Sequence, residues 1–376
     1  MTSRERLLKV LAGEVPDRVP VAPDFSNMIP ARMTGKPFWD LYLYNDPPIW
    51  EAYIAAARHF DIDSLMDGYF PLRFADEAPP GPPSESFIIQ RDERRIVVQD
   101  SYADGGKRTW ADKVRVYRVA DPPVTVEPAR IALPAVPQRF EPVEGVRPVD
   151  RSPAGLKRVM ALLGDQGLVG VYLTSTVVLS CEQDVYRYHD HGGEYERFAE
   201  ERVEAVERRF ARIMGMDPRP DFLCVGGSGT LIFQTPEIFR RLAFPAVKRA
   251  IELATAAGFP TQVHSCGPER RLVEMFAEET DLTVIDPLEP PPMGDCDLAE
   301  IKRLYGEKIV LKGNLHTTDV MLRGSAADVA AASRQAIDAA AGGGRFILST
   351  GDQCGRDTPD ENIRAMIETA RTYGEY

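Results

Sequence analysis

From about residue 168 onward, short apolar or β-branched runs alternate with longer segments in which apolar residues recur every three or four positions. The short runs predict strands and the longer segments predict helices, in a repeated βα order. The predicted strands are 168–176, 221–227, 259–265, 281–287, 308–315 and 345–351. The predicted helices are 194–214, 235–258, 268–280, 297–306, 325–343 and 358–374.

The βα order predicts a parallel sheet, because parallel neighbours need a crossover connection and right-handed helical crossovers are nearly universal. Two further runs, 18–24 and 62–67, add strands at the start of the chain and bring the number to eight. Eight such units predict a closed (β/α)8 TIM barrel in the α/β class, preceded by an N-terminal amphipathic helix.

The pattern changes over residues 79–153. Apolar and polar residues alternate there around turn signals at 92–94 and 104–106, which predicts antiparallel strands, and a proline-rich stretch follows. We interpret 79–153 as a β-rich insertion over the barrel mouth, within a single domain that spans residues 1–376.

The composition of the chain indicates which kinds of molecule it can bind. The chain has 44% hydrophobic and 27% charged residues, as globular proteins do, and a net charge of -12 that would repel nucleic acid and anionic membranes. Its N-terminus shows no signal-peptide pattern, and five scattered cysteines do not form a disulfide framework. We therefore expect a cytoplasmic protein that acts on a small molecule.

The candidate chemistry lies at strand ends, where barrel active sites gather. His264 and Cys266 end one predicted strand, and their i, i+2 spacing places both on one side of it. Asp352 and Cys354 follow the last strand. Imidazole, thiolate and a third ligand suit zinc, and three protein ligands leave an open position, as in catalytic zinc sites. Packing alone would also explain a buried cysteine and histidine.

Several other residues have two interpretations each. Cys224, beside "GGSGT", is a core cysteine or a fourth metal ligand, and the small residues there let a loop or ligand approach the backbone. His316 binds substrate, donates a proton or caps a helix. Tyr186 and Tyr188 lie in "YRYHDHGGEYE", which is a solvated loop or one wall of an aromatic substrate pocket.

Three stretches carry a resemblance to a known family: "RERLLKVLAGEVPDRVPV", "TPEIFRRLAFPAVKRAIELATAAGFPTQVHSCG" and "ILSTGDQCGRDTPDENIRAM". They resemble the uroporphyrinogen decarboxylase superfamily, and His264, Cys266 and a distal cysteine resemble its zinc-dependent, corrinoid-linked methyltransferase branch. The decarboxylases carry an arginine-rich stretch near the N-terminus, where this chain has Arg32 alone. In the methyltransferases the distal cysteine directly follows the Ser/Thr-x-Gly turn, whereas this chain has Asp352 there. We take Cys354 as the third ligand, with Asp352 as the alternative.

The resemblance implies a zinc enzyme that moves a methyl group between a small molecule and a corrinoid, a cobalamin cofactor carried by a partner protein. O-demethylation of a methoxylated compound and methylation of a thiol both fit such a site. Tyr186 and Tyr188, with the aromatic and proline content of residues 79–153, favour a methoxylated aromatic donor. The alternative is a metal-free decarboxylase in which Arg32 or Arg73 holds a carboxylated substrate. A third interpretation is a barrel that binds a ligand or the corrinoid partner without catalysis.

Overall fold

The computed structural model describes residues 1–77, 84–104 and 107–376. The proline-rich start of the predicted insertion, 79–83, and the central residues of its second predicted turn, 105–106, lie outside the described residues. The chain divides into two compact units, each described by itself below. The first unit comprises Met1–Asp24, Ala57–Leu72 and Pro153–Tyr376, and the second comprises Phe25–Ala56 and Arg73–Ser152.

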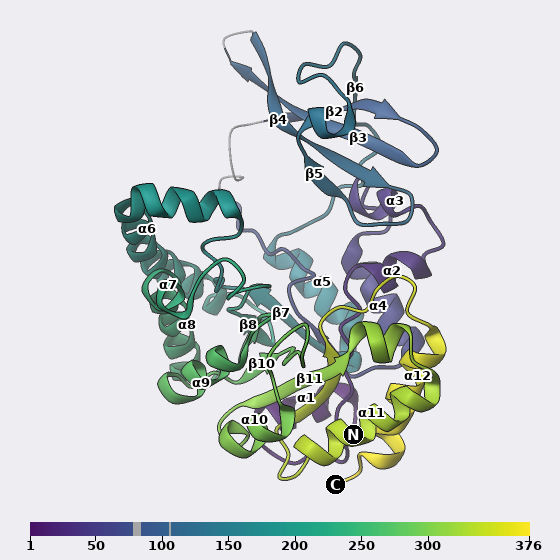
Figure 1. The fold of residues 1–376 in the computed structure, drawn as a ribbon, viewed down its shortest axis with the longest axis vertical. Helices are drawn as coiled ribbons and strands as arrows, with labels where there is room; N and C mark the ends of the chain where they lie inside the picture. The colour runs from purple at the N-terminus through teal and green to yellow at the C-terminus, as the bar shows by residue number, and fades with distance from the viewer. Residues whose placement is uncertain (78–83, 105–106) are drawn as a thin grey trace. The chain divides into compact units, whose positions relative to one another are not determined.

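The first unit is built on a parallel sheet of seven strands, as the βα order predicts (Figure 1). Each strand is short, and the inward side chains of neighbouring strands lie side by side. The strands, in spatial order, are β1 (Ser64–Met66), β7 (Gly167–Tyr172), β8 (Phe222–Cys224), β9 (Thr261–His264), β10 (Val284–Asp286), β11 (Val310–His316) and β12 (Phe346–Gly351).

The predicted first strand, 18–24, lies between the two outer strands of this sheet but pairs with them only briefly. Val21 forms a parallel bridge to Leu348 of β12. On the other side, the Asp63 backbone nitrogen donates to the Val21 oxygen at 2.9 Å. Pro20 and Pro23 lack the N–H groups that a longer ladder needs. The sheet and this segment together give the first unit the architecture of a TIM-like barrel.

Helices cover the outside of the sheet, and most lie where the sequence predicts them. The predicted helix 235–258 is two helices that meet at Ala243, because Pro245 cannot donate a backbone hydrogen bond within a continuous helix. The helices of the first unit include α1 (Ser3–Leu11), α5 (Pro153–Leu163), α6 (Glu182–Met214), α7 (Pro236–Leu242), α8 (Phe244–Ala256), α9 (Arg270–Glu279), α10 (Leu298–Tyr305), α11 (Ala326–Ala340) and α12 (Asp360–Tyr373).

The interpretation of 186–196 as a loop is wrong, because this segment is part of α6. The helix starts with Glu182 and Asp184, acidic residues that suit the positive end of a helix dipole. The structure places a kink directly before Gly192 and Gly193, where His191 has non-helical dihedral angles. The glycines therefore bend the helix at this point but do not end it.

The interior of the barrel changes from apolar to polar along the strand direction. Val284 and Val310 belong to a buried apolar cluster that also includes Leu7 of α1. Two residues further along the same strands, on the same side, Asp286 and Lys312 are also buried. The polar layer thus lies at the carboxyl ends of the strands, where a TIM-like barrel holds its active site.

The second unit contains a five-stranded antiparallel sheet with the order β5-β4-β3-β2-β6. The first predicted turn, 92–94, joins two of these strands, and the Asp92 side chain accepts hydrogen bonds from the backbone of Arg94 and Arg95. The strands are β2 (Ser84–Arg91), β3 (Arg95–Asp104), β4 (Lys107–Arg118), β5 (Val124–Val126) and β6 (Glu141–Pro142). The remaining helices are α2 (Met28–Met33), α3 (Phe38–Tyr42), α4 (Ile49–Phe60) and three short turns, η1 (Pro128–Ile131), η2 (Gly164–Gln166) and η3 (Thr317–Leu322).

Among the residues that the structure describes, none of the helices has both the length and the apolar character needed to cross a membrane.

Candidate metal centre

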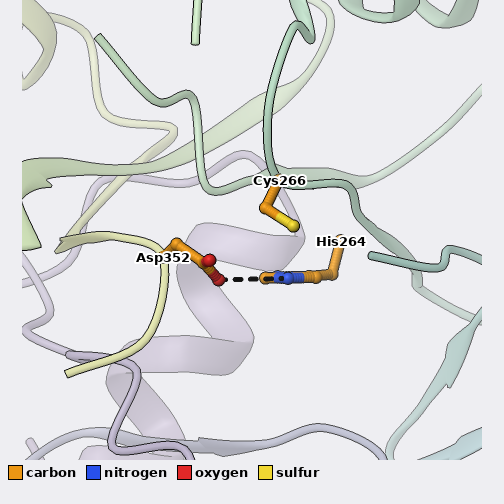
Figure 2. Close-up of side chains that lie close together, drawn as sticks. All are labelled: His264, Cys266 and Asp352. Atoms are coloured by element: carbon orange, nitrogen blue, oxygen red, sulfur yellow. Dashed lines mark ion pairs between the residues drawn. The ribbon is translucent and has the colours of Figure 1, made fainter. Parts of the chain in front are cut away.

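Three side chains with metal-ligand chemistry converge at the carboxyl ends of two strands (Figure 2). His264 is the last residue of β9, Cys266 lies two residues further on, and Asp352 directly follows β12. One ligand atom from each lies within 4.8 Å of the others. The His264 Nε2 atom is 3.6 Å from an Asp352 carboxylate oxygen. The predicted pairing of the "HSC" strand end with the loop after the last strand is thus present.

The turn that carries Cys266 is fixed by its neighbours. The Ser265 backbone nitrogen donates to the Asp286 oxygen at 2.8 Å, and the Gly267 nitrogen donates to the Glu289 carboxylate at 2.5 Å. Gly267 has a φ of +88°, which glycine adopts without strain. On the other side, a Cβ atom on Gly226 would lie 2.4 Å from the His264 backbone nitrogen. The small residues of the "GGSGT" stretch therefore allow the backbone at His264 to approach closely. This agrees with the expectation that small residues there let another segment come near the backbone.

Asp352 is held in an uncommon backbone conformation. Its φ of +91° lies in the region that favours glycine, so the surrounding loop stabilises a conformation that an aspartate rarely adopts. One of its buried carboxylate oxygens, Oδ1, has no hydrogen-bond partner within the described part of the chain. Burial raises the pKa of Asp352 to about 6, although the nearby His264 acts in the opposite direction. A buried acceptor without a donor is what a metal ligand requires.

His264 is oriented by a carboxylate behind it. Its Nδ1 lies 3.0 Å from Asp286 Oδ2, and Asp286 is the last residue of the neighbouring strand β10. This contact places the Nδ1 proton toward Asp286 and leaves Nε2 facing Asp352. Burial disfavours a charged imidazole, but the hydrogen bonds with Asp286 and Cys266 and the nearby negative charges of Asp286 and Asp24 together raise the pKa of His264 well above its ordinary value. A metal ion would therefore displace a proton from Nε2.

The structure separates the two candidates for the third ligand. Asp352 lies with His264 and Cys266, whereas Cys354 is not a member of that group. The Cys354 side chain is fully buried, and its backbone nitrogen donates to the Asp24 oxygen at 2.8 Å. The geometry thus favours the alternative ligand, Asp352, because the chain turns after Gly351 and directs residue 352 toward the strand ends.

Cys224 lies at the end of β8, at 4% exposure, within the apolar cluster of the barrel. It is not part of the metal-ligand group found among the described residues. Burial raises the pKa of its thiol well above the ordinary value, so the thiolate that a zinc ligand needs is disfavoured there. These observations favour packing over the role of fourth ligand.

His316 ends β11, and its side chain caps the segment that follows. Its Nδ1 accepts hydrogen bonds from the backbone nitrogens of Thr318 and Asp319 at 3.2 and 3.0 Å. The capping interpretation of this residue is therefore correct. With Nδ1 engaged as an acceptor, the ring proton lies on Nε2.

The two tyrosines proposed for a substrate pocket make their contacts along helices. Tyr186 is 60% exposed and donates to Glu182, one turn earlier in α6. The Tyr188 ring packs edge-on against Tyr195, and its hydroxyl accepts from Arg241. These contacts stabilise the kinked start of α6. The two tyrosines therefore do not form an aromatic loop, and the proposed aromatic wall of a substrate pocket is not supported.

Sequence reasoning missed three polar residues behind the centre: Gln262, Asp286 and Lys312. Each lies on the same side of its strand as a residue that faces the barrel interior, and all three are buried. The signal was present, since "VID" and "VLK" each place a charged residue two positions after an inward valine. A charge at a core position of a strand indicates a polar layer inside the barrel.

The donor set defines the class of site. His264 offers a nitrogen, Cys266 a sulfur and Asp352 an oxygen, which are the three ligand types that zinc takes in proteins. Three protein ligands leave one position for a substrate atom, as in catalytic zinc centres. The residues present therefore fit a catalytic metal centre at the carboxyl end of a TIM-like barrel.

Comparison with known proteins finds relatives for this part of the chain. Residues 227–373, which include all three candidate ligands, match the model of the uroporphyrinogen decarboxylase (URO-D) family. Over 170 residues the chain is 26% identical to the methylcobamide:CoM methyltransferase MtbA of Methanosarcina mazei, and over 168 residues it is 24% identical to MtbA of Methanosarcina acetivorans. Each alignment covers 45% of this chain and 44% of the relative, so the chain spans less than half of their length.

A solved structure extends the likeness in fold to the whole chain. A methyltransferase from Methanosarcina mazei superposes with a TM-score of 0.60 over 99% of both chains, at 15% identity. Together the matches confirm the resemblance to the uroporphyrinogen decarboxylase superfamily and to its methyltransferase branch.

Proposed function

We propose that this chain is a zinc-dependent methyltransferase that moves a methyl group between a small molecule and a corrinoid cofactor carried by a partner protein. The observation that carries the proposal is the convergence of His264, Cys266 and Asp352 at the barrel strand ends. Support comes from the relatives, whose names describe methyl transfer from a methylcobamide to CoM.

Each of the three residues would have a defined part in holding zinc. His264 offers Nε2, because Asp286 engages Nδ1. Cys266 offers a thiolate from a turn that backbone hydrogen bonds hold in place, and Asp352 offers the carboxylate oxygen that has no hydrogen-bond donor. When bound, zinc supplies Lewis-acid chemistry at the sulfur or oxygen that accepts or releases the methyl group.

Of the two directions of transfer, we favour methylation of a thiol. The aromatic loop that suggested a methoxylated aromatic substrate is a helix, and the tyrosines on it contact other helical residues. The relatives are named for a thiol acceptor, CoM. A site with one neutral and two anionic protein ligands leaves zinc no net positive charge, which keeps a bound thiolate nucleophilic.

The test begins with metal analysis of the protein purified without added metal, where we expect about one zinc per chain, as a single three-ligand site requires. Methylcobalamin is then supplied with candidate thiols, and a reduced corrinoid protein is supplied with methoxylated aromatics, while the cobalt absorbance is followed. The Cys266→Ala variant should lose zinc and methyl transfer together and keep the fold, because a core of this size does not depend on one ion.

Two results would contradict the proposal. A wild-type protein that binds no metal and releases CO2 from a carboxylated substrate would support the metal-free decarboxylase instead. If the Cys266→Ala variant retains both zinc and full activity, His264 and Cys266 are packing residues and do not form a metal site.

A further inference from the structure

Three charged or ionisable side chains form a row across the barrel behind the metal centre. They come from three neighbouring strands: His264 from β9, Asp286 from β10 and Lys312 from β11. The register of the sheet pairs Asp286 with His264 directly. Asp286 Oδ2 lies 3.0 Å from His264 Nδ1 and 2.8 Å from Lys312 Nζ. One carboxylate oxygen is therefore shared by a metal-ligand histidine and a lysine.

The Asp286 carboxylate has no freedom to turn. Its second oxygen, Oδ1, accepts from Gln262 Nε2 at 2.6 Å, so donors on the two flanking strands, β9 and β11, fix both oxygens. Asp286 is 1% exposed and Lys312 is 3% exposed, so neither charge is stabilised by water. Both oxygens of this buried carboxylate are thus held by donors from the neighbouring strands.

We propose that Lys312 and Asp286 are positioning residues for the metal ligand His264. Asp286 holds the Nδ1 proton and the plane of the imidazole ring, and Lys312 holds Asp286 in the position from which it can do so. This inference rests on the proposed metal centre but goes beyond it, because neither residue offers a ligand atom to the group.

The shared oxygen also sets the strength of the contact. An imidazole that donates to a carboxylate is a more basic metal ligand, and the effect depends on the negative charge on the acceptor oxygen. Since Lys312 donates to the same Oδ2 atom, it withdraws part of that charge from His264. The lysine therefore tunes the ligand as well as fixing its position.

A purely structural role predicts a different result. A buried ion pair on neighbouring strands would contribute to the stability of the barrel and leave metal affinity unchanged. Arg18 provides a matched control, since it pairs with the buried Asp63 at 2.9 Å at the opposite ends of the strands. Arg18→Met removes a buried ion pair without touching the row behind His264.

The main variant is the double substitution Asp286→Asn with Lys312→Met in the full-length chain. It removes both charges of the pair at once and leaves the net charge of the core unchanged, so the barrel should fold. The zinc dissociation constant, measured by chelator competition, should rise about 10- to 100-fold, the usual loss when such a contact is removed. The cobalt(II)-substituted protein should change its ligand-field spectrum. Lys312→Met alone should weaken zinc binding by less than the double substitution, because the charge that Lys312 withdraws from Asp286 Oδ2 returns to the contact with His264.

A readout on the metal-free protein separates this inference from the proposed function. A proton on His264 Nδ1 that is hydrogen-bonded to buried Asp286 exchanges slowly with water and gives a downfield proton NMR signal. Wild type and Arg18→Met should show the signal, and the double variant should lose it. If the signal and the zinc affinity both survive in the double variant, the inference is overturned while the metal centre stands. If wild type shows the signal but binds no metal, the metal centre fails and the orientation of His264 by Asp286 stands.

Discussion

The two ends of the barrel both bury charge, but they compensate it differently. At the amino ends of the strands, Asp63 is fully buried and accepts from Arg6 at 2.7 Å, from Arg18 at 2.9 Å and from the Val21 backbone at 2.9 Å. At the carboxyl ends, Asp352 leaves a buried carboxylate oxygen without a donor. At one end both Asp63 oxygens have donors, and at the other Asp352 Oδ1 has none among the residues that the structure describes.

Because of this difference, the amino ends of the strands contribute mainly to the stability of the fold, and the carboxyl ends contribute mainly to the binding of a cation. A buried charge with a complete set of donors contributes to holding its elements together, and removing it leaves its partners uncompensated. A buried acceptor without a donor costs free energy in the folded state, and a cation that binds there recovers that cost. The same barrel thus has a structural end and a reactive end, and variants at each should have distinct effects.

The largest expected change in stability comes from Asp63→Ala. Removing this carboxylate leaves the partly buried Arg18 without its carboxylate partner and leaves Arg6 with Asp17 alone, and such a loss costs about 3–5 kcal/mol. Urea unfolding of the metal-free protein would measure the change, and zinc affinity should remain that of wild type. A marked loss of zinc affinity in a folded Asp63→Ala protein would show that the two ends are coupled.

Asp352→Ala should have the next largest effect, on binding alone. Loss of one of three protein ligands should raise the zinc dissociation constant by about 100-fold or more, which is roughly 2.7 kcal/mol. The free energy of unfolding without metal should not fall, because no hydrogen bond to Oδ1 is lost. Equal zinc affinity in this variant and wild type would exclude Asp352 as the third ligand.

Cys354→Ala is the matched test of the competing ligand. Cys354 is fully buried, so replacing its sulfur with hydrogen should cost about 1 kcal/mol of stability through lost packing. Its zinc affinity should match that of wild type. If Cys354→Ala loses zinc to the extent expected for Asp352→Ala, Cys354 is the third ligand after all.

The smallest effect concerns pH at the structural end. The hydrogen bond from Arg6 lowers the pKa of Asp17 to about 2, although burial acts in the opposite direction. A carboxylate with a lowered folded-state pKa contributes stability above its unfolded pKa of 3.8, and this stability is lost as the pH falls toward 2. The difference in unfolding free energy between wild type and Asp17→Asn should therefore shrink between about pH 5 and pH 2. A constant difference over that range would refute the linkage.

Much of the barrel was predictable because its signals are local. The βα rhythm depends on side-chain periodicity, and the Thr235 cap, for example, accepts from the Ile238 nitrogen as its sequence position indicates. The predicted helices and loops were wrong where two local sequence features favoured different structures. Pro245 divided a helix whose apolar period is continuous, and the segment 186–196, interpreted as a loop, lies in α6, which only bends there. Periodicity by itself does not decide between these outcomes.

The centre was predictable in part. The spacing of His264 and Cys266 predicts that both lie on one side of a strand end, and the structure brings them together. The choice between Asp352 and Cys354 depended on how the chain turns after β12, which follows from a positive φ that sequence spacing does not reveal. Lys312 was missed because its contact with Asp286 crosses between strands far apart in sequence.

The backbone conformation of Asp352 has a consequence for how quickly the centre could form. The backbone at Asp352, with a φ of +91°, brings the carboxylate to within 3.6 Å of His264 Nε2. A loop that its surroundings hold in such a conformation loses little conformational entropy when a ligand arrives. Such pre-organisation makes the strand-end loop a rigid receptor whose affinity depends on its donor atoms and very little on its motion.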